Sequence, residues 1–183
     1  LIFAFLLIIS FFIIGGRRKK ANAQQVIKLP NPGNHHDIQP SLQEAVNNAS
    51  NGDTILLPAG EFYLDKRVYV ENKFVSIKGQ GKNQGGTKLY RRENISDNVL
   101  ERYPYRYMFY YKCDSTQPSN IVISNIHFKS KNPSIVLDDG GSEAGDTGIL
   151  IQRCLDIVVT NNKFEHFGHA AVYVIHYANL ASA

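Results

Sequence analysis

The chain has 183 residues, of which 43% are hydrophobic and 20% are charged. This length suits one ordinary domain, and this composition is typical of globular rather than disordered proteins. Four of the 20 lysines and arginines lie in residues 17–20, so the rest of the chain has 16 basic residues against 16 acidic ones. A formally neutral remainder gives no support to nucleic acid as a partner.

The first 23 residues have the features of an export signal. Residues 1–14 are apolar apart from one serine, and the basic residues 17–20 and Ala21-Asn22-Ala23 follow them. The apolar run is short for a membrane span, and Ala-Asn-Ala has the small-x-small form of a cleavage site. We therefore predict a signal peptide over 1–23 and a secreted or periplasmic protein. The alternative is a retained anchor, because the basic residues follow the apolar run. In that case the protein contacts a membrane only through its uncleaved leader.

A single helix is predicted at the start of the folded domain. Residues 24–40 are rich in proline, asparagine, glycine and glutamine and have no apolar period, so we predict a linker there. Ser41-Leu42-Gln43-Glu44 has the form of a capping box, and apolar residues follow at helical spacing as far as Ala49. Gly52 is placed to end the helix. We therefore predict a domain over 41–183 that begins with this helix.

The pattern after the helix is that of strands alone. Short β-branched or aromatic runs are separated by glycine, asparagine or charged turns. These runs are residues 53–57, 62–64, 68–70, 74–77 and 88–90.

An internal repeat indicates which all-β fold these strands form. Residues 120–128 align with residues 156–164, 36 positions later, with four identical and three similar residues. Residues 148–151 return as 171–174 after 23 residues, which is close to the length of one coil of a β-helix. The longer offset predicts an outward loop inserted between Ser130 and Thr147.

Stacked coils place equivalent residues one strand spacing apart, about 4.8 Å. We therefore predict a ladder of Asn125 over Asn161 in a bend between strands, where asparagine tolerates unusual backbone angles. The predicted core pairs are Ile121 with Ile157, Ile123 with Val159, and Phe128 with Phe164. A bare end of the stack would expose strand edges to aggregation, and the helix is placed to cover it.

The opening of the domain resembles that of the pectate-lyase-like superfamily. The residues that carry this resemblance are 41–45, 51–63 and 75–81, and it spans about residues 38 to 177. It implies an all-β fold, a right-handed parallel β-helix (solenoid) with a short N-terminal capping α-helix. The fold is expected to be C-terminally incomplete, because no C-terminal cap is evident before Ala183. The superfamily includes lyases, hydrolases, epimerases, tailspikes, adhesins and copper-site maturation proteins, so the resemblance is specific for architecture and not for activity.

From this resemblance we predict an exported carbohydrate-active protein. It is expected to be a lyase, hydrolase or epimerase that acts on an acidic polysaccharide. The alternative is a non-catalytic surface β-helix, an adhesin or a binding module for glycan or protein. No catalytic motif of a particular family is recognised.

The candidate catalytic residues are histidines and a lysine near the second repeat. A lyase needs a base to remove the proton next to a uronate carboxylate. His127 falls over Lys163, and such a like-charge pair lowers both proton affinities. His166 and His169 lie in the turn after the second repeat strand, where these folds often place ligand contacts. The plain alternative is that these are ordinary exposed residues, as we expect for Lys129 over Glu165, a surface ion pair.

A glycine-rich acidic segment is a candidate Ca²⁺ site, because carboxylates are the hard oxygen ligands that Ca²⁺ takes. Its acidic residues are Asp138, Asp139, Glu143 and Asp146. They match no fixed metal spacing, so a solvated loop is the alternative.

An aromatic and basic segment over 102–112 is a candidate saccharide contact. Aromatic rings stack on sugars, and arginine binds carboxylates. The residues concerned are Arg102, Tyr105, Arg106 and Tyr107. The alternative is plain packing, because half of the rings face inward if the segment is a strand.

The two cysteines, Cys113 and Cys154, follow basic residues at equivalent places relative to the repeat strands. We therefore expect them on neighbouring coils, with Cα atoms about 4.8 Å apart. Stacked side chains point the same way rather than toward each other, so we predict two reduced, buried cysteines. A disulfide, which export makes chemically feasible, is the alternative.

Overall fold

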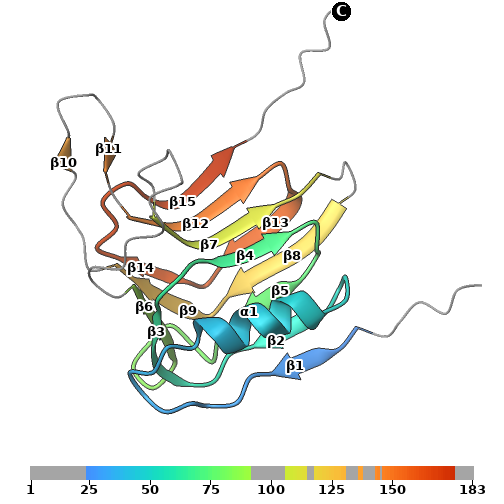
Figure 1. The fold of residues 1–183 in the computed structure, drawn as a ribbon, viewed down its shortest axis with the longest axis horizontal. Coiled ribbons are helices and arrows are strands. Elements are labelled where there is room, and N and C mark those ends of the chain that lie inside the picture. The colour runs from blue at the N-terminus through green and yellow to red at the C-terminus, as the bar shows by residue number, and fades with distance from the viewer. Residues whose placement is uncertain are drawn as a thin grey trace, which may run out of the picture.

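The computed structural model describes residues 24–91, 106–114, 118–130, 136–137, 143–144 and 146–175. Figure 1 shows strands stacked in parallel with one short helix at the end nearest the N-terminus. The predicted signal peptide lies outside the described residues. Within those ranges, no helix is both long enough and apolar enough to cross a membrane.

Three parallel sheets contain nearly all of the described strands. Sheet A consists of β1 (Val26–Lys28), β2 (Thr54–Leu56), β5 (Ser76–Lys78), β8 (Pro118–Ser124) and β13 (Leu155–Thr160). Sheet B consists of β3 (Gly60–Leu64), β6 (Thr87–Arg91), β9 (Ile126–Lys129) and β14 (Lys163–Glu165). Sheet C consists of β4 (Val68–Glu71), β7 (Arg106–Lys112), β12 (Asp146–Gln152) and β15 (Ala170–Ile175).

The chain visits sheets A, B and C in turn and then returns to A, so three successive strands form one coil. We number these coils from 1 to 4: β2 to β4, β5 to β7, then β8, β9 and β12, and finally β13 to β15. Each coil lies on the one before it with parallel pairing. The all-β prediction is confirmed, and the arrangement is consistent with a parallel β-solenoid.

The core is an apolar ladder in the register that the repeat predicts. Ile121, Ile123 and Phe128 are fully buried. They pair with Ile157, Val159 and Phe164 of the next coil. The rings of Phe128 and Phe164 stack with centroids 5.0 Å apart. Removal of these side chains from water is the main force that holds the coils together.

The predicted asparagine ladder is also present. Asn125 and Asn161 have φ angles of 62° and 51°, in the left-handed region that asparagine adopts more readily than most residues. The Asn161 amide nitrogen donates a hydrogen bond to Asn125 Oδ1. The same bend is therefore repeated in coils 3 and 4, and a polar contact joins the two bends.

Helix α1 (Gln39–Asn48) begins two residues before the predicted capping box, so the predicted start is wrong. Ile38 is the N-cap residue and supplies no side-chain cap. Instead, Asp37 Oδ1 accepts a hydrogen bond from the backbone N–H of Gln39 at 2.9 Å. A proline in the first turn suits a helix start, because its missing N–H has no partner there in any case.

The N-terminal edge of every strand of coil 1 is covered. Strand β1 pairs with β2 in parallel. Residues 35–38 form backbone hydrogen bonds with β3, including Tyr63 N–H to His36 O at 2.9 Å. The Gln43 side chain bonds both backbone groups of Tyr69 in β4, donating to its carbonyl at 2.9 Å and accepting from its N–H at 2.8 Å. The prediction that the helix packs on the end of the stack is confirmed, whereas residues 24–40 are part of the fold and not a linker.

The long offset of the repeat arises between β9 and β12, as predicted. An antiparallel pair, β10 (Val136–Leu137) and β11 (Glu143–Ala144), lies there and projects beside the stack (Figure 1). Asp146, which we predicted in the outward loop, instead begins β12 and is only 3% exposed. That part of the prediction is wrong, because buried polar partners hold this carboxylate inside.

These partners form a buried network at the corner between sheets B and C. Arg91, at the end of β6, is 2% exposed and donates to the Tyr107 carbonyl at 2.7 Å. Its Nε lies 3.9 Å from Asp146 Oδ1, and the Ser130 hydroxyl donates to Asp146 Oδ2. The chain leaves coil 2 after Arg91 and coil 3 after Ser130, and it returns near Tyr107 and at Asp146. One network thus connects all four points. A buried charge is tolerated only with such partners.

We expect Arg91→Met or Asp146→Leu alone to lower the free energy of unfolding by about 3–5 kcal/mol, because each leaves one buried charge unpaired. The double variant is expected to recover most of this loss, because no unpaired charge remains. Urea unfolding of all four proteins measures the effect. Additive losses in the double variant would show that the two side chains do not act as a pair.

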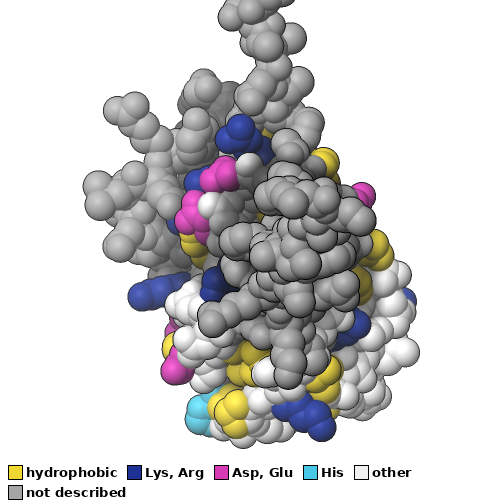
Figure 2. Space-filling view, turned by 90° about the vertical axis from the view of Figure 1, so that its right-hand side faces the viewer, with side chains coloured by type: hydrophobic (Ala, Val, Ile, Leu, Met, Phe, Trp, Pro, Cys, Tyr) yellow, Lys and Arg dark blue, Asp and Glu magenta, His cyan; other side chains and the backbone are white. Residues whose placement is uncertain are grey.

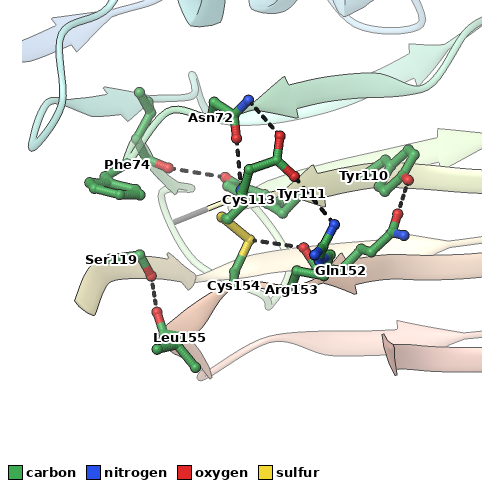
Figure 3. Close-up of a disulfide and its surroundings, with 12 residues drawn as sticks. Asn72, Phe74, Tyr110, Tyr111, Cys113, Ser119, Gln152, Arg153, Cys154 and Leu155 are labelled. Atoms are coloured by element: carbon green, nitrogen blue, oxygen red, sulfur yellow. Dashed lines mark hydrogen bonds and ion pairs between the residues drawn. A yellow bond between two sulfur atoms is a disulfide. The ribbon is translucent and has the colours of Figure 1, made fainter. Parts of the chain in front are cut away.

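A disulfide joins coils 2 and 3 at the corner between sheets C and A (Figure 3). The Cα atoms of Cys113 and Cys154 are 4.8 Å apart, as predicted for neighbouring coils, but the predicted reduced state is wrong. Arg153 has a φ of 59°, so the backbone bends just before Cys154. Consequently the two side chains are not simply stacked, and Cys154 turns toward Cys113.

Replacement of both cysteines by serine is expected to lower stability by about 4 kcal/mol in the chain-entropy model, because the bond closes a loop of 41 residues. Denaturant unfolding of the wild type with and without reductant provides the control, since the reduced wild type should match the double variant. The unfolded, unreduced wild type should contain no free thiol. Two free thiols there would contradict the disulfide.

Candidate functional site on the outer face of sheet B

The outer face of sheet B carries two columns of polar and aromatic side chains. Inward residues such as Phe128 alternate with outward ones, and the register brings the outward ones into line. The first column is Glu61, Lys88, His127 and Lys163, and the second is Tyr63, Tyr90, Lys129 and Glu165. We call these residues the sheet B grid.

Glu165 connects three basic side chains of the grid. Its Oε2 lies 2.7 Å from His127 Nε2 and 2.9 Å from Lys163 Nζ, and its Oε1 lies 3.4 Å from Lys129 Nζ. The hydrogen bond from Lys163, together with those from His127 and Lys129, lowers the pKa of Glu165 to about 2. This carboxylate is therefore ionised at neutral pH.

The register that we predicted for this region is confirmed, but it did not reveal the role of Glu165. Lys163 lies over His127, and Glu165 lies over Lys129. The contact between His127 and Glu165 runs diagonally between the two columns. Such diagonal neighbours are about 7–8 Å apart at the backbone and lie within reach of long side chains. The sequence signal for this contact was the spacing of two residues between Lys163 and Glu165, which places both side chains on the same face of the strand.

His127 is only 7% exposed, although it points outward. Burial is the largest cause that lowers its pKa below the ordinary value of 6.5, and Lys163 and Lys88 act in the same direction. The hydrogen bond to Glu165 opposes them. The sequence-based expectation of a lowered proton affinity thus agrees in direction, but desolvation rather than Lys163 is the main cause.

The same contacts select the tautomer of His127. An ionised carboxylate only accepts hydrogen bonds, so the Nε2 that faces Glu165 carries the proton. In the neutral ring Nδ1 then keeps its lone pair and is the basic atom. The geometry therefore provides a neutral imidazole base beside two lysines.

The other end of the grid is electrically balanced. Lys88 Nζ lies 3.3 Å from Glu61 Oε1, and the Tyr90 hydroxyl donates to Glu61 Oε2 at 2.9 Å. These contacts, led by the hydrogen bond from Tyr90, lower the pKa of Glu61. Lys88 also lies 4.8 Å from the centroid of the Tyr90 ring.

The two other candidate histidines are separated. His166 is exposed, and its Nε2 lies 4.0 Å from Glu165 Oε1, so it borders the grid. His169 lies at the next corner, where its Nδ1 is 3.0 Å from Thr147 Oγ1 and its ring contacts Tyr173 of sheet C. The structure thus groups His127, Lys163 and His166, and places His169 elsewhere.

Asp146, one of the four predicted Ca²⁺ ligands, is buried, and its carboxylate is held by Arg91 and Ser130. Asp138 and Asp139 lie outside the described residues, and only the backbone of Glu143 is described. Ca²⁺ at these three residues stays a prediction. Within the described ranges, no group of three or more His, Cys, Asp or Glu side chains is arranged to hold a metal ion.

The aromatic and basic segment contributes little to an accessible site in the described part of the chain. Tyr107 is 8% exposed and its carbonyl accepts from Arg91, so it is a packing residue. Only the backbone of Arg106 is described, and Arg102 and Tyr105 lie outside the described residues. Phe109 and Tyr111 face the core, as expected for half of the rings of a strand.

The distribution of charge and the comparisons with known proteins do not assign this chain to a family. Among the described side chains visible in Figure 2, acidic and basic ones are interspersed and form no extended region of one sign. No protein-family model, no curated protein and no solved structure matches this chain. The class is therefore defined by the structure itself: the described residues form an all-β fold with three parallel sheets, a short antiparallel pair and one short helix.

Two substitutions next to His127 are expected to shift its pKa in opposite directions. Glu165→Gln should lower it further, because the carboxylate stabilises the imidazolium, whereas Lys163→Met should raise it by removing a nearby positive charge. Titration of the His127 ring protons by NMR measures both shifts against the wild type. Shifts of the same sign would mean that the contacts of the grid are not those described.

Proposed function

We propose that this chain is an exported carbohydrate-active protein with a right-handed parallel β-helix fold of the pectate-lyase-like type. It acts on an acidic polysaccharide by removing the proton next to a uronate carboxylate. The observation that carries the proposal is His127, a neutral base with a lowered pKa that lies between cationic side chains on an outer face.

The chemistry follows from the groups of the grid. His127 Nδ1 takes the proton from the carbon next to the carboxylate, and the electron pair of that C–H bond moves toward the carboxylate. In elimination, the bond to the glycosidic oxygen then breaks, and the leaving oxygen gains a proton. This gives an unsaturated sugar. Epimerisation shares the first step and differs in returning a proton to the opposite face of the carbon.

The cations near His127 suit this step, because negative charge develops on the uronate as the proton leaves. Lys129 and Lys163 carry two positive charges, and the ionised Glu165 cancels one. A single positive charge therefore remains beside a neutral His127, which complements one uronate carboxylate. Long basic side chains also reorient at little cost when a second carboxylate arrives.

Hydrolysis is less well supported by the described carboxylates of the grid. Glu61 and Glu165 lie three coils apart, which is about 14 Å along the stack at one strand spacing per coil, and they also lie in different columns. The paired carboxyl groups of glycoside hydrolases are only about 5–9.5 Å apart. The pKa of each is also lowered, so neither keeps a proton to donate at neutral pH. Elimination or epimerisation is therefore preferred.

Export is supported by two independent features. Residues 1–23 have the pattern of a signal peptide, and the disulfide between Cys113 and Cys154 needs an oxidising compartment to form and persist. We propose a secreted or periplasmic protein whose partner is an acidic polysaccharide. Nucleic acid is not proposed as a partner, and a membrane is contacted only through an uncleaved leader.

The second candidate function is a non-catalytic surface β-helix that binds glycan or protein. The network around Glu165 favours it, because this carboxylate already accepts a hydrogen bond from His127 and forms ion pairs with two lysines, which holds these basic groups in place. In that case the grid binds an acidic glycan without breaking it. Turnover therefore separates the two candidates.

We expect the full-length protein to release unsaturated products from a polyuronate. The ultraviolet absorbance of these products measures the rate. His127→Ala should reduce the rate by about 10²–10⁴, because the base is removed. Lys163→Met should also reduce it, whereas Lys78→Met, a matched lysine variant on sheet A, should not. Wild-type binding without product would favour the non-catalytic candidate, and an unchanged rate in His127→Ala would exclude His127 as the base.

A further inference from the structure

The grid continues toward the N-terminal end of the stack as a row of aromatic rings. The ring centroids of His35 and Tyr63 are 6.0 Å apart, and those of Tyr63 and Tyr90 are 6.1 Å apart. Tyr63 and Tyr90 occupy the same column as Lys129 and Glu165, in coils 1 and 2. Both tyrosine side chains are partly exposed. A row of rings therefore leads directly to the cluster around His127.

The two halves of the grid differ in charge. In coils 1 and 2 Glu61 and Lys88 cancel each other, and the two tyrosines are neutral. In coils 3 and 4 one positive charge remains beside His127. An acidic group is therefore attracted to coils 3 and 4, whereas the rings of coils 1 and 2 offer apolar surface.

The shape of the grid fixes the direction in which a chain molecule can use both halves. Two residues separate its columns along each strand, about 7 Å, whereas its four coils extend about 14 Å across the strands. A short oligosaccharide is an elongated molecule, so it fits the grid along the longer of these two directions. Only a ligand that lies along the stack meets the rings and the cations together.

We propose that Tyr63 and Tyr90 form an aromatic subsite for an acidic polysaccharide that lies along the stack and across the strands of sheet B. The C–H face of one sugar packs on these rings, while the carboxylate of a neighbouring uronate is held over coils 3 and 4. This inference rests on the proposed function, which supplies the uronate end of the ligand. It adds the direction of the polysaccharide and the residues that bind its other end.

The test uses titration calorimetry with saturated oligouronates of increasing length in the full-length His127→Ala variant, which prevents turnover. Affinity is expected to rise with length until both halves of the grid are filled. Tyr63→Ala and Tyr90→Ala should each weaken binding of the longer oligomers about tenfold and leave binding of a single uronate unchanged. Tyr63→Phe and Tyr90→Phe should bind like the parent, because stacking needs the ring and not the hydroxyl.

Tyr69→Ala is the matched control, because Tyr69 is an outward tyrosine of coil 1 on sheet C. It should leave every affinity unchanged. Added salt provides a second control. It should weaken the binding of a single uronate, which depends on charge, and leave unchanged the gain in affinity that the tyrosines add for longer oligomers.

The outcomes separate this inference from the proposed reaction. Equal affinities of the parent and Tyr63→Ala for long oligomers would overturn the aromatic subsite, even if the wild type cleaves polyuronates. If binding depends on both rings but the wild type releases no unsaturated product, the aromatic subsite is supported and the proposed elimination reaction is excluded. Failure of every oligomer to bind would overturn both, and a loss in the phenylalanine variants equal to that in the alanine variants would exclude stacking.

Discussion

The stacking of each strand on its equivalent in the previous coil, in exact register, is the constraint on which the other contacts depend. Phe128 lies over Phe164, Asn125 over Asn161, and His127 over Lys163 because one register relates coils 3 and 4 from Ile121 to Lys129. A slip of one residue would turn every core side chain outward and expose the apolar ladder. The hydrophobic core therefore also fixes the order of the polar residues on the outer face.

In a stack of this kind the exposed strand edges at the end must be covered, and the points where the chain leaves and re-enters a coil must be held in place. At the N-terminal end β1, residues 35–38 and the Gln43 side chain bond the free backbone groups of coil 1, so no bare strand edge remains there. At the corner between sheets B and C, Arg91 and Asp146 form a buried pair that ties two adjacent coils. Both devices place polar groups where the regular pattern of the strands ends.

The chemical character of the sheet B grid comes from small differences in burial and charge along one face. His127 is buried enough to lose proton affinity, and Glu165 stays ionised because basic groups surround it. Glu61 and Lys88 balance each other in coils 1 and 2. A regular scaffold thus presents a neutral aromatic region and a positive region side by side, which is the basis for the proposed contacts with an acidic polysaccharide.

The sequence by itself determined the all-β architecture, the covering helix, the register of coils 3 and 4, and the adjacency of Cys113 and Cys154 on neighbouring coils. These features follow from periodicity, because in-register stacking reduces the fold to a repeat along one direction. Only the tertiary structure decided that Glu165 bonds His127 diagonally, that Asp146 turns inward to Arg91, and that the bend at Arg153 allows a disulfide. Side-chain direction at corners and contacts between columns decide these points, and a one-dimensional pattern does not encode them.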